Sequence, residues 1–219
     1  MLTIIKKRLL LKAFRNRVDD FLWNNIINNI NLIKPEGQYI PVAILITNIT
    51  GYVNFAEKLE LDVLKEYMSK YYNAIDEAIY NNHGFIDLIY GDTITAFWGF
   101  PINYNNYIND ACKSSLEQLI AINNLNVWAN NNKLPPIKIR IGITQGNCLA
   151  GNFGNYFKPK FTVAGETYNR CMTLEKLNKK YNTSILIDEN VKNYISGFIV
   201  NKVDKFIIKD SDIKIYELK

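Results

Sequence analysis

Two apolar runs, separated by a glycine–aspartate pair, stand near the middle of the chain. They cover residues 85–90 and 93–98, and both are rich in β-branched and aromatic side chains. Such runs are typical of strands with at least one buried face. The pair Gly91-Asp92 between them indicates a tight two-residue turn. We therefore predict a β-hairpin over residues 84–99 that carries one carboxylate, Asp92, at its tip.

The region before this hairpin shows two further hydrophobic patterns. A near-continuous apolar run over residues 39–48 predicts a buried central strand. Apolar residues then recur at helical spacing over residues 53–81, which predicts one long helix. The junction at residues 48–53 contains Gly51 and directs backbone N–H groups and a helix N-terminus toward one place. This geometry suits phosphate, although a single glycine is a weak signal by itself.

The region after the hairpin predicts a second long helix over residues 109–131 and a strictly alternating strand over residues 137–144. We interpret Gly146, Gly151 and Gly154 as turns around a further strand. The later predicted elements are a short strand, a helix, another strand and three short tail strands, at residues 161–164, 165–180, 184–187, 198–200, 205–208 and 213–218.

The order strand, helix, hairpin, helix, strand is the βαββαβ order of a ferredoxin-like sheet, here followed by extra strands. The predicted fold class is therefore α+β, with a mixed and mostly antiparallel sheet. Pro35-Glu36-Gly37 marks the one clear boundary. It divides the chain into an N-terminal segment, residues 1–37, and a folded domain, residues 38–219.

The N-terminal segment is predicted to form a basic helix over residues 1–33. Its first half mixes apolar residues with six basic ones, Lys6, Lys7, Arg8, Lys12, Arg15 and Arg17. A basic amphipathic helix can lie on a membrane surface. A helix that connects or dimerises domains has the same pattern, so both interpretations stay open.

Composition narrows the class of protein. With 219 residues and 48% apolar residues, the chain can bury a real core. A net charge of +5 is compatible with an anionic small molecule as a partner, but it is too small for the basic stripe of a nucleic-acid binder. Three widely separated cysteines, Cys112, Cys148 and Cys171, indicate small buried residues in a reducing compartment. We therefore expect a cytoplasmic protein, and no apolar run approaches the roughly 18–20 residues that span a bilayer.

Several stretches together resemble the catalytic domain of the class III nucleotidyl cyclases, the adenylate and guanylate cyclases. They are ILITNITGY (44–52), HGFIDLIYGDTITAFWGFP (83–101), IRIGITQGNCLAGNFG (139–154), FTVAGETYN (161–169) and LEKLNKKYNTSILI (174–187). The resemblance covers residues 38–219. It implies the cyclase fold and a head-to-tail dimer, formed with a second copy or with another cyclase domain, whose sites lie across the interface. It also implies a nucleoside triphosphate and two magnesium or manganese ions.

The resemblance assigns roles at the centre of the reaction. Asp92 matches the second metal-binding aspartate, whereas the first falls on Asn48. Asn169 matches the asparagine that orients the ribose, whereas the arginine of the transition state falls on Thr173. Arg170 precedes Thr173 by about one helical turn, ~4.5 Å of rise, so we expect that it could reach the same phosphate.

The resemblance also assigns the nucleotide contacts. The base-reading lysine falls on Leu88, while its partner position carries Thr162, a residue that the family also uses. Because of Leu88, the base preference is open. The backbone amides of Ile49, Thr50 and Gly51 could hold phosphate. The lysines that could contact the triphosphate, or could simply lie on the surface, are Lys158, Lys160 and Lys209.

Of these differences from the family, the asparagine at the first metal-binding position, Asn48, matters most for catalysis. A carboxylate offers two anionic oxygens to a hard cation, whereas an amide offers one neutral oxygen. Loss of a transition-state donor typically costs ~10²–10³ in rate, and in a homodimer both sites carry the same departures. We therefore expect a dimerising, nucleotide-binding domain that is impaired in its own catalysis. The alternative is an active, manganese- or magnesium-dependent cyclase that forms a 3′,5′-cyclic nucleotide and pyrophosphate.

Overall fold

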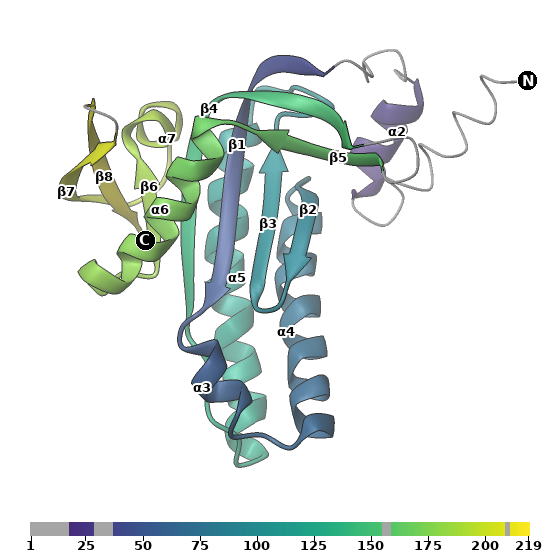
Figure 1. The fold of residues 1–219 in the computed structure, drawn as a ribbon, viewed down its shortest axis with the longest axis vertical. Helices are drawn as coiled ribbons and strands as arrows, with labels where there is room; N and C mark the ends of the chain where they lie inside the picture. The colour runs from purple at the N-terminus through teal and green to yellow at the C-terminus, as the bar shows by residue number, and fades with distance from the viewer. Residues whose placement is uncertain (1–17, 29–36, 155–158, 209–210) are drawn as a thin grey trace, which may run out of the picture.

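The computed structural model describes residues 18–28, 37–154, 159–208 and 211–219 (Figure 1). In chain order its elements are α2 Asp20–Asn28, β1 Gln38–Ile49, α3 Tyr52–Ala56, α4 Leu61–Asn81, β2 Phe85–Tyr90, β3 Thr93–Trp98, α5 Tyr107–Asn131, β4 Ile139–Gly154, β5 Pro159–Ala164, α6 Glu166–Tyr181, β6 Ile185–Asp188, α7 Glu189–Tyr194, β7 Val200–Ile208 and β8 Ser211–Leu218.

The strands form one eight-stranded sheet in the order β2-β3-β1-β4-β6-β8-β7, with β5 paired to β4. The pair β4 and β6 is parallel, and the other described pairs are antiparallel. The first four strands, with α4 and α5 as connections, have the ferredoxin-like βαββαβ order. The predicted α+β fold class and the predicted hairpin are therefore confirmed.

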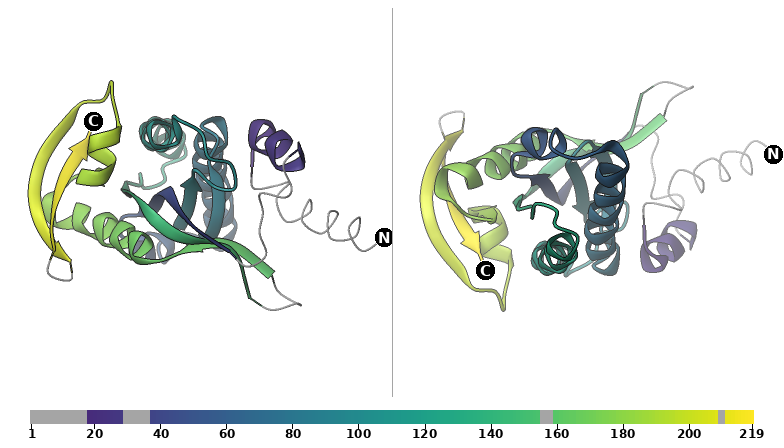
Figure 2. Two further views of the ribbon diagram at one scale, coloured as in Figure 1. Left: turned by 90° about the horizontal axis from the view of Figure 1, so that it is seen from above. Right: turned by 90° about the horizontal axis from the view of Figure 1, so that it is seen from below.

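Helices cover both faces of the sheet (Figures 1 and 2). Alternate residues of β1, such as Leu45 and Ile49, pack with α4 and α5 on one face. The intervening residues, such as Ile44 and Ile46, pack on the other face with α6, β5 and α2. Because successive strand residues point to opposite faces, a nearly continuous apolar run was needed to bury β1 on both sides.

The strand β4 corrects the prediction of two strands divided by turns. It runs without interruption through the glycines at 146 and 151. A Cβ atom at Gly146 would lie 2.7 Å from Oγ1 of Thr167 in α6, and one at Gly151 would lie 2.5 Å from Cα of Gly37. These glycines therefore allow other chain segments to approach the strand closely, and they do not mark turns.

Two other elements differ from the predictions. The single helix expected over residues 53–81 is divided into α3 and α4. The tail forms two strands, β7 and β8, in place of three, and a short helix, α7, precedes them. The carboxylate of Asp188 caps α7 by accepting a hydrogen bond from the amide of Val191 at 2.9 Å.

The helix α2 lies within the helix predicted over residues 1–33, whereas the six basic residues at 6–17 and the boundary at 35–36 lie outside the described residues. Leu22 and Ile26 of α2 are buried against the sheet. Asp19 contacts Nδ1 of His83 at the C-terminal end of α4. None of the helices in the described residues combines the length and the hydropathy of a membrane-spanning segment.

The three cysteines are buried and free, as predicted. Burial raises the pKa of the Cys112 and Cys171 thiols far above the usual range. Thiols with a raised pKa are weak nucleophiles at neutral pH, so the structure assigns these two residues to the core.

Candidate functional site

The end of β1, the turn of the hairpin, the start of α3 and the start of β4 meet at one end of the sheet (Figure 1). They line an open pocket of about 260 Å³. The residues that line it are Asn48, Ile49, Gly51, Tyr52, Val53, Asn54, Asp92 and Arg140. The pocket therefore brings together both predicted metal positions and two of the three residues expected to hold phosphate.

Asn48 is held between two neighbouring strands. It lies opposite Arg140 in the register of β1 and β4. Its side-chain oxygen accepts a hydrogen bond from Nη2 of Arg140 at 2.9 Å. Its side-chain nitrogen donates to Oγ1 of Thr93 at 2.8 Å. Both ends of the amide are thus engaged by protein groups.

Arg140 was not among the predicted site residues. Its Nε donates to Oε1 of Glu175 on α6 at 2.8 Å, and the two side chains are only 17% and 8% exposed. Burial raises the pKa of Glu175, and the charge and hydrogen bond of Arg140 oppose that rise. A charged residue inside the alternating stretch IKIRIGIT was the available signal, but its register against Asn48 depends on the folded sheet.

Asp92 sits at the tip of the hairpin, and α4 fixes the turn. The hydroxyl of Tyr71 donates to the backbone oxygen of Asp92 at 2.8 Å, and that of Tyr72 donates to the backbone oxygen of Gly91 at 2.7 Å. Burial raises the pKa of the Asp92 carboxyl, while hydrogen bonds from its own amide, from the amide of Ile49 and from the Asn48 side chain, together with the charge of Arg140, lower it. The carboxylate is therefore placed in the pocket and partly desolvated.

The phosphate contacts expected from residues 49–51 are only partly available. Gly51 has a left-handed backbone, φ 72°, and a Cβ there would meet no atom within 4 Å. The amide of Thr50 donates to the backbone oxygen of Lys138 at 2.8 Å. The amide of Ile49 hydrogen bonds to the carboxylate of Asp92. The bond to Lys138 corrects the expectation for Thr50, whose amide serves the loop itself.

The residues predicted to read the base and to contact the ribose lie on other elements. Leu88 is 37% exposed on β2, and Thr162 is buried on β5. Asn169 and Thr173 lie one turn apart on α6, where the Thr173 hydroxyl donates to the backbone oxygen of Asn169 at 3.0 Å. None of the four lines the pocket at Asp92. Of the predicted lysines, Lys160 is exposed, and 158 and 209 lie outside the described residues.

Arg170 is committed to the interior. Its Nε donates to Oδ2 of Asp188 at 2.7 Å, and its Nη2 donates to the backbone oxygen of Gln145 at 2.8 Å. The side chains of Arg170 and Asp188 are 10% and 1% exposed. Burial raises the pKa of Asp188, and the charge of Arg170 opposes this rise. This ion pair corrects the expectation that Arg170 could replace an arginine at the position of Thr173.

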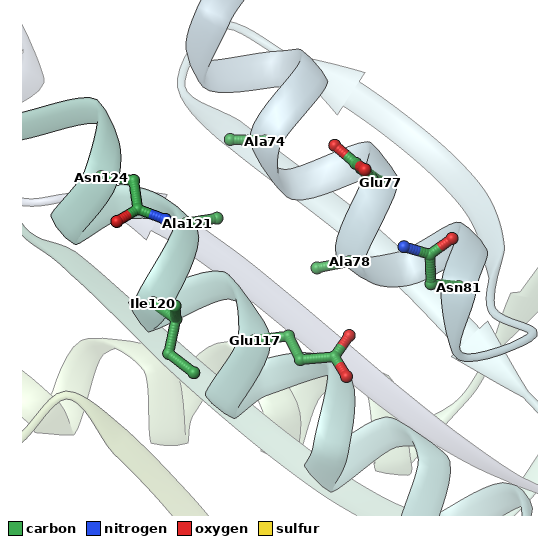
Figure 3. Close-up of a pocket in the computed structure, with 8 residues that line it drawn as sticks. All are labelled: Ala74, Glu77, Ala78, Asn81, Glu117, Ile120, Ala121 and Asn124. Atoms are coloured by element: carbon green, nitrogen blue, oxygen red, sulfur yellow. The ribbon is translucent and has the colours of Figure 1, made fainter. Parts of the chain in front are cut away.

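A second pocket, of about 170 Å³, lies between α4 and α5 (Figure 3). Small side chains of both helices line it, with carboxylates and amides around them: Ala74, Glu77, Ala78, Asn81, Glu117, Ile120, Ala121 and Asn124. It contains none of the predicted site residues. Of these two pockets, only the one at Asp92 is lined by predicted site residues.

The donor set at Asp92 does not fit a pair of divalent ions. Its polar lining has one carboxylate, Asp92, and one guanidinium, Arg140. The remaining oxygen-bearing side chains are neutral: Asn48, whose amide is already hydrogen bonded at both ends, Asn54 and Tyr52. Within residues 18–28, 37–154, 159–208 and 211–219, no three histidine, cysteine, aspartate or glutamate side chains cluster in a way that could hold a metal ion. Hard dications prefer several oxygen ligands, with carboxylates among them.

Comparisons with known proteins agree on one family. Residues 35–219 match the family model described as "Adenylate and Guanylate cyclase catalytic domain". The chain is 26% identical over 145 residues to "Adenylate cyclase 1" of Rhizobium meliloti, covering 66% of this chain and 22% of that protein. It is 29% identical over 209 residues to "Adenylate cyclase" of Anabaena cylindrica, covering 87% and 41%. The chain thus spans less than half the length of these relatives.

Solved structures show the same fold. The structure of the adenylyl cyclase CyaB from P. aeruginosa aligns with a TM-score of 0.77 at 22% identity, covering 83% of this chain and 95% of that one. At this level of identity the likeness concerns the fold alone.

Proposed function

The chain belongs to the adenylate and guanylate cyclase catalytic domain family, and on that premise we propose that it is a nucleotide-binding domain of cyclic-nucleotide signalling with little turnover of its own. The family uses nucleoside triphosphates and divalent metals. We propose that this chain keeps the means to bind a triphosphate and has lost much of the means to cyclise it.

The hydrogen bond between Asn48 and Arg140 carries this proposal. It engages the one side-chain oxygen that residue 48 could offer to a cation and places a positive charge beside that oxygen. Asp92 is then the one carboxylate in the lining of the pocket. A 3′-hydroxyl is a weak nucleophile at neutral pH, and divalent ions normally activate it and neutralise the leaving group. A pocket that holds its ions poorly would therefore turn over a bound triphosphate slowly.

The binding function rests on the groups that remain. Arg140 presents a planar guanidinium, which suits phosphate oxygens, and Glu175 holds it in place. The pocket also has open space at Gly51, because a Cβ at this position would contact nothing within 4 Å. These two features support a polyphosphate in the pocket, with its charge directed toward Arg140.

We also propose that a second domain completes the site, in a head-to-tail dimer with another copy or with another cyclase domain. The positions predicted to contact base and ribose lie on β2, β5 and α6, away from the lining of the pocket. This separation is what a site across an interface requires. Leu88 and Asn169 are exposed, so both are accessible to a partner.

The direct test is a product assay on the purified chain with Mn²⁺ or Mg²⁺ and each of ATP, GTP, CTP and UTP. We expect no cyclic nucleotide above background, together with measurable binding of at least one 3′-deoxynucleoside triphosphate, which cannot cyclise. Robust turnover of any substrate would reject the loss of catalysis and identify an active cyclase. Absence of binding to all four analogues would reject the binding function.

The variant Asn48→Asp tests the metal position separately from the differences at Leu88 and Thr173. If it alone restores turnover, the metal position is the main defect, and the departures at Leu88 and Thr173 are tolerated. If it binds a second ion but stays inactive, the missing arginine at position 173 limits the reaction. The exposed control Lys113→Gln on α5 should behave as the unchanged chain.

A further inference from the structure

We propose that the groove between α4 and α5 is a docking surface for the basic N-terminal segment of the same chain, residues 1–17. The groove is the pocket of about 170 Å³ drawn in Figure 3. This inference does not depend on the proposed function, because none of the predicted site residues lines this groove. It assigns a binding surface on the folded domain to a segment whose sequence pattern left a membrane surface and a connecting helix as open alternatives.

The groove combines small apolar side chains with carboxylates. Ala74 and Ala78 point from α4 toward α5, and Ala121 points from α5 toward α4 (Figure 3). Glu77 and Glu117 belong to the same lining. This lining suits a long side chain that has an aliphatic stem and a cationic head. The groove is smaller than the ~300–1,000 Å³ of pockets for small molecules, so it fits single side chains of a protein segment better.

The carboxylate of Glu77 is available to a partner. Glu77 is exposed, and within the described ranges of the chain no residue forms a hydrogen bond or an ion pair with it. Glu117 is partly engaged, because it accepts a hydrogen bond from Asn82 at 2.5 Å and lies 3.8 Å from Nζ of Lys113. Ile120 lines the groove and is 60% exposed. The groove therefore offers one free carboxylate, a second that is partly engaged, and apolar surface.

The distribution of charge along the chain favours the basic segment as the occupant. Residues 1–17 contain six basic residues and no acidic one. Residues 61–131, from the start of α4 to the end of α5, contain eight acidic and three basic residues. Opposite charges of this kind steer two surfaces together and fix their orientation. Leu9, Leu10 and Phe14 lie among the basic residues and provide apolar groups for the exposed Ile120.

The segment is tethered beside the groove. It is followed by Val18, which is buried, and by Asp19, whose carboxylate contacts Nδ1 of His83. His83 follows Asn81, a lining residue of the groove, by two positions. When extended, 17 residues span ~56 Å, whereas α4, with 21 residues, is ~32 Å long. The segment can therefore reach Glu77 from this anchor, and a short tether keeps its local concentration high.

The test is cross-linking of the full chain with a carbodiimide, which joins an amine to a carboxylate in contact with it. Mass spectrometry identifies the linked residues. We expect links from the lysines of residues 1–17 to Glu77 and Glu117, at a higher yield than to Glu66, an exposed carboxylate of α4 outside the groove. Links spread evenly over the exposed carboxylates, or the absence of links to the groove, would overturn the inference.

An equal mixture of ¹⁵N-labelled and unlabelled chains shows whether the segment docks on its own molecule. We expect linked peptides in which both halves carry the same isotope. Links to the groove that join labelled and unlabelled peptides as often as like peptides would assign the groove to a second copy of the chain. That result would reject docking within one molecule.

Charge reversal tests the ion pairs in the groove. Glu77→Lys should lower the yield of links to Glu117 about two- to five-fold, the effect of one exposed ion pair. Glu66→Lys makes the same change of charge outside the groove and should leave this yield unaltered. Circular dichroism checks that both variants fold as the unchanged chain does. Equal yields in the two variants would contradict a role for the groove carboxylates and overturn the inference.

Vesicles distinguish the groove from a membrane surface, since basic segments with apolar residues also bind anionic lipids. The cross-linking is repeated with vesicles that contain phosphatidylglycerol and phosphatidylcholine, and with vesicles of phosphatidylcholine alone. We expect the links to the groove to persist in both. Loss of the links with the anionic vesicles alone would assign the segment to a membrane surface, and the docking proposal would be wrong.

Discussion

Asn48, Asp92 and Arg140 lie together in the pocket at Asp92, and each is held by a neighbour on another element. Thr93 and Arg140 orient Asn48, Glu175 holds Arg140, and the amide of Ile49 supports Asp92. Removal of one of these protein charges should change which ligand charges the pocket can bind. Elsewhere an unpaired charge affects the stability of the fold instead, and Asp76 on α4 is such a case.

Asp76 has one buried carboxyl oxygen without a hydrogen-bond partner among the described residues, and burial raises its pKa from 3.8 to about 6. The folded protein therefore holds this proton more tightly than the unfolded chain, so stability falls as pH rises from about 4 through about 6. We expect Asp76→Asn to raise the free energy of unfolding by ~1–2 kcal/mol at pH 7.5, after allowance for solvent screening. Near pH 3.5 the gain should vanish.

Urea unfolding at pH 3.5, 5 and 7.5 measures this difference. Glu77→Gln, an exposed carboxylate at the next position, is the matched control and should change little at any pH. A gain for Asp76→Asn that is the same at all three values would show that the charge of Asp76 is not its cause.

At the scale of elements, the helix α4 positions the hairpin tip. Two adjacent tyrosines of this helix donate to the backbone oxygens of Gly91 and Asp92. The turn that carries the acidic side chain is thus joined by two hydrogen bonds to a helix of 21 residues. Preorganisation of this kind lowers the cost of binding an ion or a phosphate.

We expect Tyr71→Phe and Tyr72→Phe each to cost ~0.5–1.5 kcal/mol of stability, the usual net value of one hydrogen bond. The cost should be larger for Tyr71, which is buried. Both variants should weaken binding of Mn²⁺ with tripolyphosphate several-fold, because the tip loses part of its support. Titration calorimetry and urea unfolding measure the two effects.

Tyr80→Phe serves as the control for the hairpin contacts, since Tyr80 is a partly exposed tyrosine of the same helix. It should leave both affinity and stability close to those of the unchanged chain. Unaltered ligand affinity in both tip variants would mean that α4 contributes stability but does not position Asp92.

At the scale of the whole molecule, the predicted site residues are divided between the pocket and positions outside its lining. Asn48 and Asp92 lie in the pocket, whereas Leu88, Thr162 and Asn169 lie outside its lining. In a head-to-tail homodimer, each pocket would meet the other surface of the partner. Two defective chains with changes in different halves should then complement each other.

We expect Asp92→Asn and Asn169→Ala each to weaken binding of the preferred 3′-deoxynucleotide in the presence of Mn²⁺. After equal mixing and exchange, about half of the dimers are mixed and each has one intact site, so about a quarter of all sites should recover. Equilibrium binding measures the fraction. A mixture of Asp92→Asn with a chain carrying both changes is the control and should recover none. No recovery in the first mixture would argue against a shared site.

Local patterns were sufficient for much of the fold. The strands of the hairpin, Phe85–Tyr90 and Thr93–Trp98, cover the two predicted runs residue for residue. The order of strands and helices, and with it the α+β class, follows from hydrophobic periodicity, because each element must bury one face wherever it packs. The motifs were likewise enough to identify the family.

Contacts between distant residues decided the rest. The bond from Arg140 to Asn48 joins positions 92 residues apart in sequence, and the ion pair that removes Arg170 from the site depends on how α6 packs against β6. The glycines of β4 have the local pattern of turns, and only the neighbouring segments show why they lie in a strand. Periodicity reports which face of an element is buried, whereas the partner of a polar side chain is chosen by strand register and helix packing. For this reason the sequence by itself determined the fold and the family, and the tertiary structure decided which charges share the pocket.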